Sequence, residues 1–156
     1  MERVQLLKAL MSNLEKDEGV EKSPNISIKL SKALDFSKED RKIIRDFCGM
    51  CSKLLELEDQ YDCFLESDRK ISKIITTAIC AFSERNIRIY CHKRSMADIL
   101  RSIGHEMFHL RQHELDLVPS NMKQHHLSPI EWHANAAGGA LLSYFAQKVG
   151  RDKIYR

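Results

Sequence analysis

The chain has 156 residues, of which 43% are hydrophobic and 30% charged, and its formal net charge is +3. This length predicts a single domain, residues 1–156, that is large enough to bury a substantial core. The small basic excess is scattered among acids and argues against a phosphate-binding track, while no stretch approaches the roughly 18 apolar residues of a membrane span.

The first residues lack the apolar core of a signal peptide, so we expect a cytoplasmic protein. Residues 1–60 form a mainly helical portion that matches no motif. Within it, residues 3–16 carry the apolar stripe of a helix, and residues 25–30 alternate as a short strand does. Ser37 begins a second helix, which we expect to run to about Glu58. This portion either completes the core or covers a functional site.

The middle of the chain predicts strands. Residues 61–66 form one, and residues 71–82, which are apolar and rich in β-branched side chains, are expected to be mostly strand. A turn at residues 83–86 precedes residues 87–91, which alternate as a half-buried strand does. That strand leads directly into a helix that begins near Ser95.

Five cysteines make an odd set without the spacing of a disulfide framework: Cys48, Cys51, Cys63, Cys80 and Cys91. In a cytoplasmic protein most of them are expected to be reduced thiols in the core. Cys48 and Cys51 form a C-x-x-C pair. The pair lies inside an apolar helical stretch, whereas redox pairs sit at helix N-termini. No second pair completes a zinc site, so we expect core packing from these thiols.

Residues 105–109 read His-Glu-Met-Phe-His, an H-E-x-x-H motif inside the helix that follows Ser95. Residues four apart lie on one helix face, so His105 and His109 can hold one zinc ion. Glu106, between them, is placed to hold and deprotonate a zinc-bound water. The helix is expected to bury its apolar face and to offer the histidine face to a cleft.

Zinc with two histidines needs a third protein ligand. A histidine six residues after the second is excluded, because that position is Leu115. A helix that opens at Ser128 and Pro129 instead offers Glu131, with Asn135 one turn later as a hydrogen-bond partner for a ligand histidine. Glu131 is also three residues after a serine N-cap, a spacing that by itself predicts a capping box without metal.

Other side chains compete for the role of third ligand: His113, Glu114, His125, His126 and His133. His113 continues the stripe of His105 and His109 by one more turn. It lies two turns from His105, about 11 Å along the helix, which is too far for both to bind one ion. We therefore expect His113 at the rim of the site.

The last predicted helix runs from Pro129 to about Val149 and is rich in small residues. Gly138 and Gly139 lie in its middle, where each glycine costs about 1 kcal/mol relative to alanine. Such a pair predicts the close approach of another element, and the natural candidate is the H-E-x-x-H helix.

Two segments resemble a known family. Residues 99–112 resemble the active helix of small zincin-like metallopeptidases encoded by tailed bacteriophages. Residues 130–142 resemble their second helix, which carries a Glu-x-x-Ala-Asn signature. The two-part signature is shared with the wider ImmA/IrrE-type metallopeptidases. The resemblance covers about residues 87–146, the expected metal-site core.

The resemblance implies an α+β, zincin-like fold, in which a small mixed or antiparallel sheet packs on the H-E-x-x-H helix and a C-terminal helix carries the glutamate. It also implies Zn²⁺ held by His105, His109 and Glu131, with Glu106 as the catalytic carboxylate. The chain departs from the ImmA/IrrE pattern at Ala137, where that family often has a bulky aromatic, and no helix-turn-helix segment is recognisable.

These features predict a zinc metallopeptidase, most simply an endopeptidase acting on proteins or peptides, in the host cytoplasm if the chain is phage-encoded. Strand 87–91, placed at the sheet edge, would pair with an extended substrate. The oxyanion donor has several candidates: Tyr90, His92, His113, His133 and Tyr144. The alternative is a catalytically silent zinc-binding interaction protein of a phage or mobile element, although a purely structural site has no need of Glu106. A weaker alternative is a nucleic-acid-associated protein.

Overall fold

The computed structural model describes residues 1–17, 25–68, 77–119 and 128–156. Its elements follow in chain order: α1 (Arg3–Lys16), β1 (Ile26–Leu30), α2 (Lys38–Leu54), β2 (Tyr61–Glu66), β3 (Ala78–Ala81), the 3₁₀ turn η1 (Phe82–Glu84), β4 (Asn86–Tyr90), α4 (Met96–Glu114), α5 (Pro129–Val149) and α6 (Arg151–Ile154). None of the described helices is both long and apolar enough to cross a membrane.

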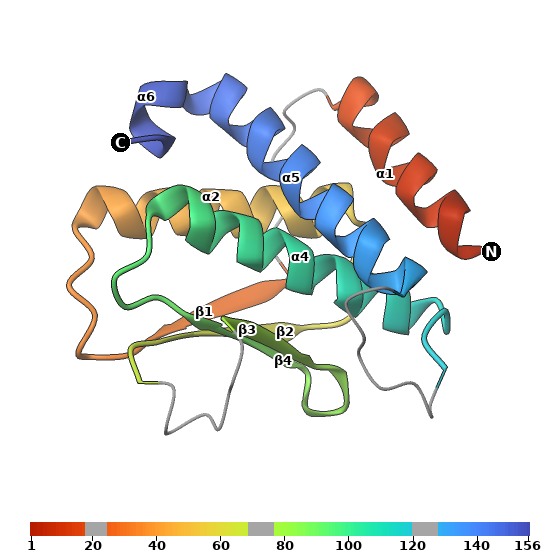
Figure 1. Cartoon of the computed structure of the whole chain (residues 1–156), viewed down its shortest axis with the longest axis horizontal. Helices are drawn as coiled ribbons and strands as arrows, with labels where there is room; N and C mark the ends of the chain where they lie inside the picture. The colour runs from red at the N-terminus through yellow and green to blue at the C-terminus, as the bar shows by residue number, and fades with distance from the viewer. Residues whose placement is uncertain (18–24, 69–76, 120–127) are drawn as a thin grey trace.

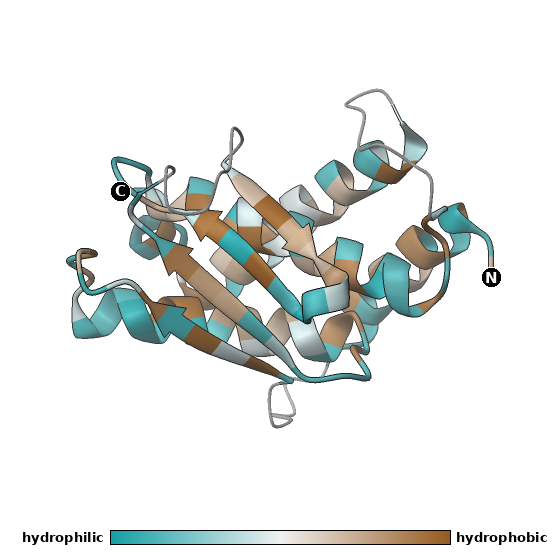
Figure 2. Cartoon of the chain, turned by 90° about the horizontal axis from the view of Figure 1, so that it is seen from below, coloured by the Kyte–Doolittle hydropathy of each residue, from teal (hydrophilic) through white to brown (hydrophobic). Residues whose placement is uncertain are grey.

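The fold is α+β, with a small mixed sheet of four strands in the order β1-β2-β4-β3. β1, β2 and β4 are parallel, and β3 pairs antiparallel with β4. The helices lie on one face of this sheet: α2 and α4 pack next to it, and α1 and α5 lie beyond them (Figure 1). Seen from below, the strands of the sheet lie in front and the helices lie behind and beside them (Figure 2).

The expected strands at 25–30, 61–66 and 87–91 are all present, each within one residue of the predicted bounds. Pairing of strand 87–91 with a substrate required that strand to form a sheet edge, and this condition is not met: β4 lies inside the sheet, between β2 and the edge strand β3. Alternation of apolar and polar residues reports which face of a strand is buried and carries no information about its neighbours. Of the predicted strand 71–82, residues 78–81 are strand, and residues 69–76 lie outside the described part.

Helix α2 begins where its N-cap predicts, because the Ser37 hydroxyl accepts a hydrogen bond from the backbone N–H of Asp40. It ends at Leu54, four residues before the expected Glu58. The cause is Glu56, whose φ of 56° places it in the left-handed region and stops the helix. The apolar side of α2 enters the same buried cluster as residues from α1, the sheet, α4, α5 and α6.

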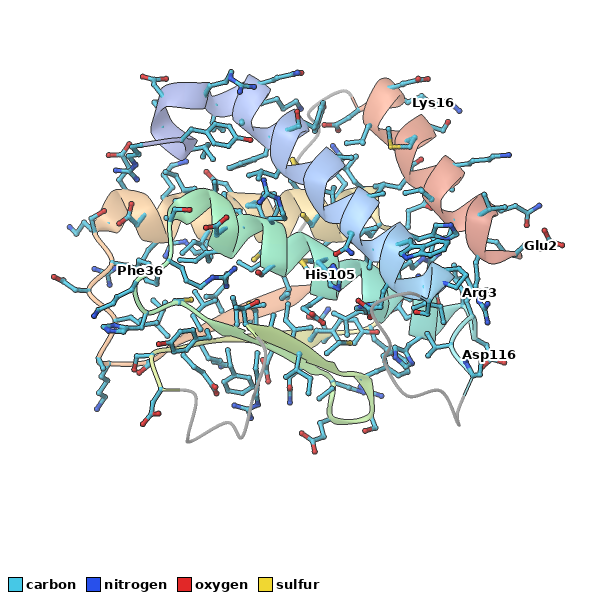
Figure 3. All side chains as sticks on the ribbon, viewed as in Figure 1. Glu2, Arg3, Lys16, Phe36, His105 and Asp116 are labelled. Carbon is cyan, nitrogen blue, oxygen red and sulfur yellow. The ribbon has the colours of Figure 1, made fainter. Side chains whose placement is uncertain are left out.

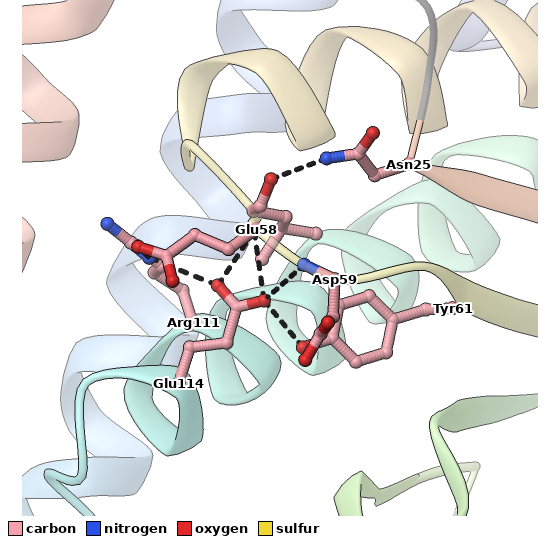
Figure 4. A network of polar contacts seen from close by, with 7 residues as sticks. Asn25, Glu58, Asp59, Tyr61, Arg111 and Glu114 are labelled. Carbon is pink, nitrogen blue, oxygen red and sulfur yellow. Dashed lines mark hydrogen bonds and ion pairs between the residues drawn. The ribbon is translucent and has the colours of Figure 1, made fainter.

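The C-terminal end of α4 is fastened to the loop before β2 by the carboxylate of Glu114 (Figure 4). This carboxylate accepts hydrogen bonds from the backbone N–H groups of Glu58 and Asp59, from the Tyr61 hydroxyl at 2.6 Å and from Arg111 at 3.1 Å. Burial and the hydrogen bond to Glu114 raise the pKa of Tyr61. Glu114, one of the rival metal ligands, is therefore fully engaged in holding the helix.

Helices α4 and α5 approach each other most closely where two glycines meet. A Cβ atom on Gly104 would lie 3.3 Å from the Cα of Gly138, and a Cβ on Gly138 would lie 2.9 Å from the carbonyl oxygen of Arg101. A Cβ on Gly139 would have no atom within 4 Å. The predicted close approach is therefore confirmed for Gly138, and Gly139 has no part in it.

The two glycines of α5 provide a matched pair for a stability test. We expect Gly138→Ala to lower the free energy of unfolding by about 1–2 kcal/mol, because the added methyl group meets backbone that cannot move aside. Gly139→Ala should raise it by about 0.5–1 kcal/mol, because only helix propensity changes. Urea unfolding followed by circular dichroism measures both, and equal effects of the two substitutions would contradict the close contact.

Candidate metal centre

Helix α4 carries the H-E-x-x-H motif in its buried middle. Its start is fixed by Ser95, whose hydroxyl accepts a hydrogen bond from the N–H of Asp98. His105 and His109 are one turn apart, and their Nε2 atoms are 3.1 Å from each other. His105 lies near the centre of the molecule, where α4 passes beneath α5 (Figure 3).

The expected open histidine face of α4 is largely covered. His109 is only 2% exposed, and the neighbouring Gln112 is fully buried. The reason is the glycine contact, which brings α5 down onto this side of α4. Only His105 and His113, among the three histidines of the stripe, remain partly exposed.

The first turn of α5 brings Glu131 to the two histidines. Ser128 caps this helix by accepting a hydrogen bond from the N–H of Glu131, as the sequence predicts. The side chain of Glu131 points to α4: its Oε2 lies 3.1 Å from His105 Nε2, and its Oε1 lies 2.8 Å from His109 Nε2. The sequence left two roles open for Glu131, third metal ligand or capping residue. The position of its carboxylate beside the two histidines suits the role of ligand.

The three side chains form a cluster suited to one cation. Their ligand atoms all lie within 4.8 Å of one another. Among the described residues, this is the one set of histidine, cysteine and acidic side chains that lies close enough together to hold a metal ion. The side chains of His105 and Glu131 keep 17% and 15% of their exposure, so the cluster remains open to water on one side. Two imidazoles, one carboxylate and an open position suit a metal ion that binds both nitrogen and oxygen.

Gln112 orients His109 for this role. The Nδ1–H of His109 donates to Gln112 Oε1 at 2.6 Å, and Gln112 Nε2 donates to the carbonyl oxygen of Ile130 at 3.3 Å. A neutral His109 ring then has its lone pair on Nε2, facing the Glu131 carboxylate at 2.8 Å. Two acceptors at this distance repel each other unless a positive charge joins them. A proton or a bound metal cation supplies that charge.

Gln112 takes the part that the sequence assigned to Asn135. The side chain of Asn135 is exposed on α5, and the ring nitrogen of His109 has Gln112 as its partner. The helical spacing of Gln112, three residues after His109, is compatible with this contact. Polar residues flank the motif on both sides, however, so the spacing alone did not single it out.

Glu106 lies beside the cluster with one oxygen unpartnered. It is 6% exposed, its Oε1 is 3.8 Å from His105 Nε2, and its buried Oε2 has no hydrogen-bond partner among the described residues. Burial raises the pKa of Glu106, the positive charges of His109 and His105 lower it, and Glu131 raises it further, with a net upward shift. A buried carboxyl with a free oxygen is equipped to exchange a proton with a group that enters the site.

The opposite shift occurs at Glu131. Burial pushes its pKa upward, but the hydrogen bonds from His105 and His109 outweigh burial and hold the pKa well below the ordinary value of 4.5. Glu131 therefore stays ionised over the whole physiological range. The pKa values of the two carboxylates are thus shifted in opposite directions, so that Glu131 stays charged and Glu106 is able to take up a proton.

The sequence did not connect Cys80 with the site. It lies on edge strand β3, and burial and the charges of Glu106 and Glu131 raise the pKa of its thiol. The thiol is therefore neutral. Cys48 and Cys51, as predicted, are buried within α2, and burial likewise raises the pKa of Cys51.

The residues expected at the rim of the site have different surroundings in the structure. His113 stacks on Phe82 with ring centroids 4.8 Å apart, and burial and the charge of His109 lower its pKa. Tyr144 was wrongly expected near the site, because its hydroxyl donates to Asp17 at 2.5 Å. His133 lies on α5, and its buried Nδ1 has no hydrogen-bond partner in the part of the chain that the structure describes.

Two further oxyanion candidates lie where β4 ends: Tyr90 is the last residue of that strand, and its ring centroid is 6.5 Å from that of His92. The rival ligands His125 and His126 fall outside the described residues. The cluster of His105, His109 and Glu131 thus remains the metal-binding candidate of the described chain.

No protein-family model matches this sequence, and no curated protein and no solved structure is significantly similar to it. Inferences about activity therefore depend on the chain's own residues.

The competing assignments of Gln112 and Asn135 can be separated by metal binding. We expect Gln112→Ala to weaken zinc affinity about 10–100-fold, because His109 loses the acceptor that fixes its tautomer. Asn135→Ala, on the exposed side of α5, should change the affinity less than about twofold. Titration against a zinc-chelating dye measures both, and a larger effect at Asn135 would reverse the assignment.

The metal-free protein should be most stable in mildly acidic solution. Burial lowers the pKa of His109, but its contacts with Glu131 and Glu106 raise it above the ordinary 6.5, so the stability from its protonated ring is complete below 6.5 and is lost as pH rises through the raised pKa. The stability from ionised Glu131 is complete above 4.5 and is lost as pH falls through its lowered pKa.

In excess chelator we therefore expect Tm to be highest between pH 4.5 and pH 6.5, the ordinary pKa values of Glu131 and His109. Towards alkaline pH it should fall by about 2–5 °C. Added zinc should remove the alkaline loss, since the metal then supplies the positive charge. Glu131→Gln is the control, because it removes the carboxylate and should flatten the alkaline decline. An identical pH profile for this variant and the wild type would exclude the pair as its source. Differential scanning fluorimetry is sufficient for the comparison.

Proposed function

We propose that the protein is a zinc metallopeptidase that hydrolyses internal bonds of proteins or peptides in the cytoplasm. The observation that carries this proposal is the buried carboxylate of Glu106 beside the cluster of His105, His109 and Glu131, with one oxygen that no group of the described chain partners. A site that only holds a metal for stability has no use for such a group.

We assign zinc to this donor set, because two imidazoles one helical turn apart, a glutamate beside them and one further carboxylate with an open position are typical of hydrolytic zinc sites. When bound, zinc lowers the pKa of a water molecule and polarises a carbonyl group. His105, His109 and Glu131 would hold it. The hydrogen bond from His109 to Gln112 would keep Nε2 free for it.

Glu106 would then serve as the general base and the general acid. Its carboxylate accepts a proton from the attacking water and later returns that proton to the leaving amine nitrogen. The raised pKa of Glu106 favours both steps, since a carboxyl that titrates nearer neutrality both accepts and donates readily. Of the proposed oxyanion donors, Tyr90, His92, His113 and His133 remain candidates after the assignment of Tyr144 to Asp17.

An extended substrate fits the edge strand β3. β3 pairs on one side with β4, and among the described strands its other side has no partner. Its Cys80 lies close enough to Glu106 and Glu131 for their charges to act on its thiol. A peptide that adds to β3 would therefore run past the cluster with its carbonyl groups in fixed register. The role proposed for strand 87–91 passes to β3.

The zincin-like interpretation and the relation to phage and ImmA/IrrE-type metallopeptidases belong to this proposal. They are supported by an antiparallel edge strand on an otherwise parallel sheet, an H-E-x-x-H helix beneath it and a second helix that delivers Glu131.

Two substitutions test the proposal. Glu106→Gln should keep about one zinc per chain and lower the cleavage rate about a hundredfold or more, because the amide cannot accept the proton. Glu131→Ala should lose zinc together with activity. Elemental analysis measures the metal, and a fluorescence-quenched peptide library with random central residues measures cleavage.

The matched control is Glu15→Gln on the exposed side of α1, which should keep both zinc and activity. Full cleavage by Glu106→Gln would refute the role of Glu106. A wild type that holds zinc and cuts no peptide in the library would favour the silent zinc-binding alternative.

A further inference from the structure

The other edge of the sheet carries a groove that no part of the proposed chemistry uses. A hollow of about 310 Å³ lies between β1 and α2, and its walls are formed by Ile26, Ser27, Ile28, Leu30, Arg41, Ile44, Arg45 and Cys48. The strand order places β1 at the edge opposite β3, so this groove lies two strands away from the edge beside the metal cluster.

The outer edge of β1 offers free backbone groups. The backbone N–H of Tyr61 donates to the carbonyl oxygen of Asn25, and that of Ser31 donates to the carbonyl oxygen of Leu65. These two bonds fix which residues of β1 point their backbone groups towards β2 and which point them away. Ser27 and Lys29 therefore direct their N–H and C=O groups to β2, and the residues between them direct theirs outward. In the described part of the chain no strand pairs with this outer edge.

The same alternate residues of β1 present apolar side chains to the hollow. Ile26 and Ile28 form part of its wall, and Leu30 at its end is 39% exposed. From α2, Ile44 and Cys48 contribute a buried apolar surface. A strand that paired with β1 would place every second side chain over this surface.

The rim of the groove is positively charged. Arg41 and Arg45 lie one turn apart on α2, on the face that lines the hollow, and both are exposed. Arg41 donates only to the main-chain oxygen of Ser37, and within the described residues no carboxylate faces Arg45. Neighbouring Lys42, by contrast, is already paired with Asp46 at 2.6 Å.

We propose that this groove binds an extended acidic peptide segment of a partner protein, which adds to β1 as a fifth strand. An apolar side chain of the segment fills the hollow, and a carboxylate two residues away, on the same side of the strand, pairs with Arg41 and Arg45. A second copy of this chain is the poorer occupant, since pairing through β1 would bring the arginines of both copies together. The inference does not depend on zinc or on catalysis.

The probe is the peptide Thr-Val-Thr-Leu-Thr-Glu-Thr-amide, which carries fluorescein on its N-terminal amine. It is titrated with the full chain carrying Glu106→Gln so that the probe stays intact. We expect saturable binding by fluorescence anisotropy. Arg45→Glu should weaken it about tenfold, because an attraction becomes a repulsion. Lys8→Glu, which makes the same charge change on the exposed side of α1, should weaken it less than about twofold.

Backbone pairing is tested on the probe itself. N-methylation of alternate residues blocks the N–H groups on one edge of the peptide strand. One of the two alternate sets should abolish binding, and the other should leave it nearly unchanged.

Three results would overturn the proposal: no binding at about millimolar protein, equal losses for Arg45→Glu and Lys8→Glu, or equal binding of both methylated sets. Displacement of the probe by decanoate at lower concentration than by the unlabelled peptide would also overturn it, because the groove would then be a site for an apolar acid.

Discussion

The contact between Gly104 and Gly138 sets the distance between α4 and α5, and the cluster of His105, His109 and Glu131 depends on that distance. Gly138 lies seven residues, or two turns, after Glu131, so both face α4 from the same side of α5. Gly104 directly precedes His105. A Cβ on Gly138 would meet the backbone N–H of His105 at 3.2 Å. The glycines thus permit an approach that lets a side chain as short as glutamate reach both histidines at 2.8–3.1 Å.

This close packing has an electrostatic cost, because it buries charged and polar groups together. Two sets of contacts offset it: Gln112 partners both His109 and the first turn of α5, and Glu131 lies against both histidines. A neutral His109 ring would leave its lone pair facing the Glu131 carboxylate, so this packing favours a positive charge between them, from a proton or from a metal cation. The metal ion proposed for this site would therefore favour the folded chain.

The sequence predicted the parts of the site that follow from spacing along one helix. His105 and His109 meet because they are four residues apart, and Glu131 was found through the N-cap that places it in the first turn of α5. What it missed depends on neighbours in space. Gln112 and Asn135 have equally suitable spacing, and only the packing of α5 buries one and exposes the other. The edge position of β3 is likewise a matter of strand order, which alternation does not encode.

The arrangement of the helices explains why both sheet edges are available for binding. The described helices lie on one face of the sheet (Figure 1), so the other face meets water. Ser27 and Lys29 on β1 and Asp62 and Glu66 on β2 lie at the exposed or half-buried alternate positions of that face. There Arg88 pairs with Glu66 and covers the ring of Phe64 at 4.4 Å, so that even the aromatic side chain is shielded. Among the described strands, β1 and β3 each have one side that no other strand pairs with. β3 runs near the carboxylates of Glu106 and Glu131, whereas β1 runs beside Arg41 and Arg45. The same backbone chemistry at the two edges is thus combined with different charges, and the edges are suited to different peptides.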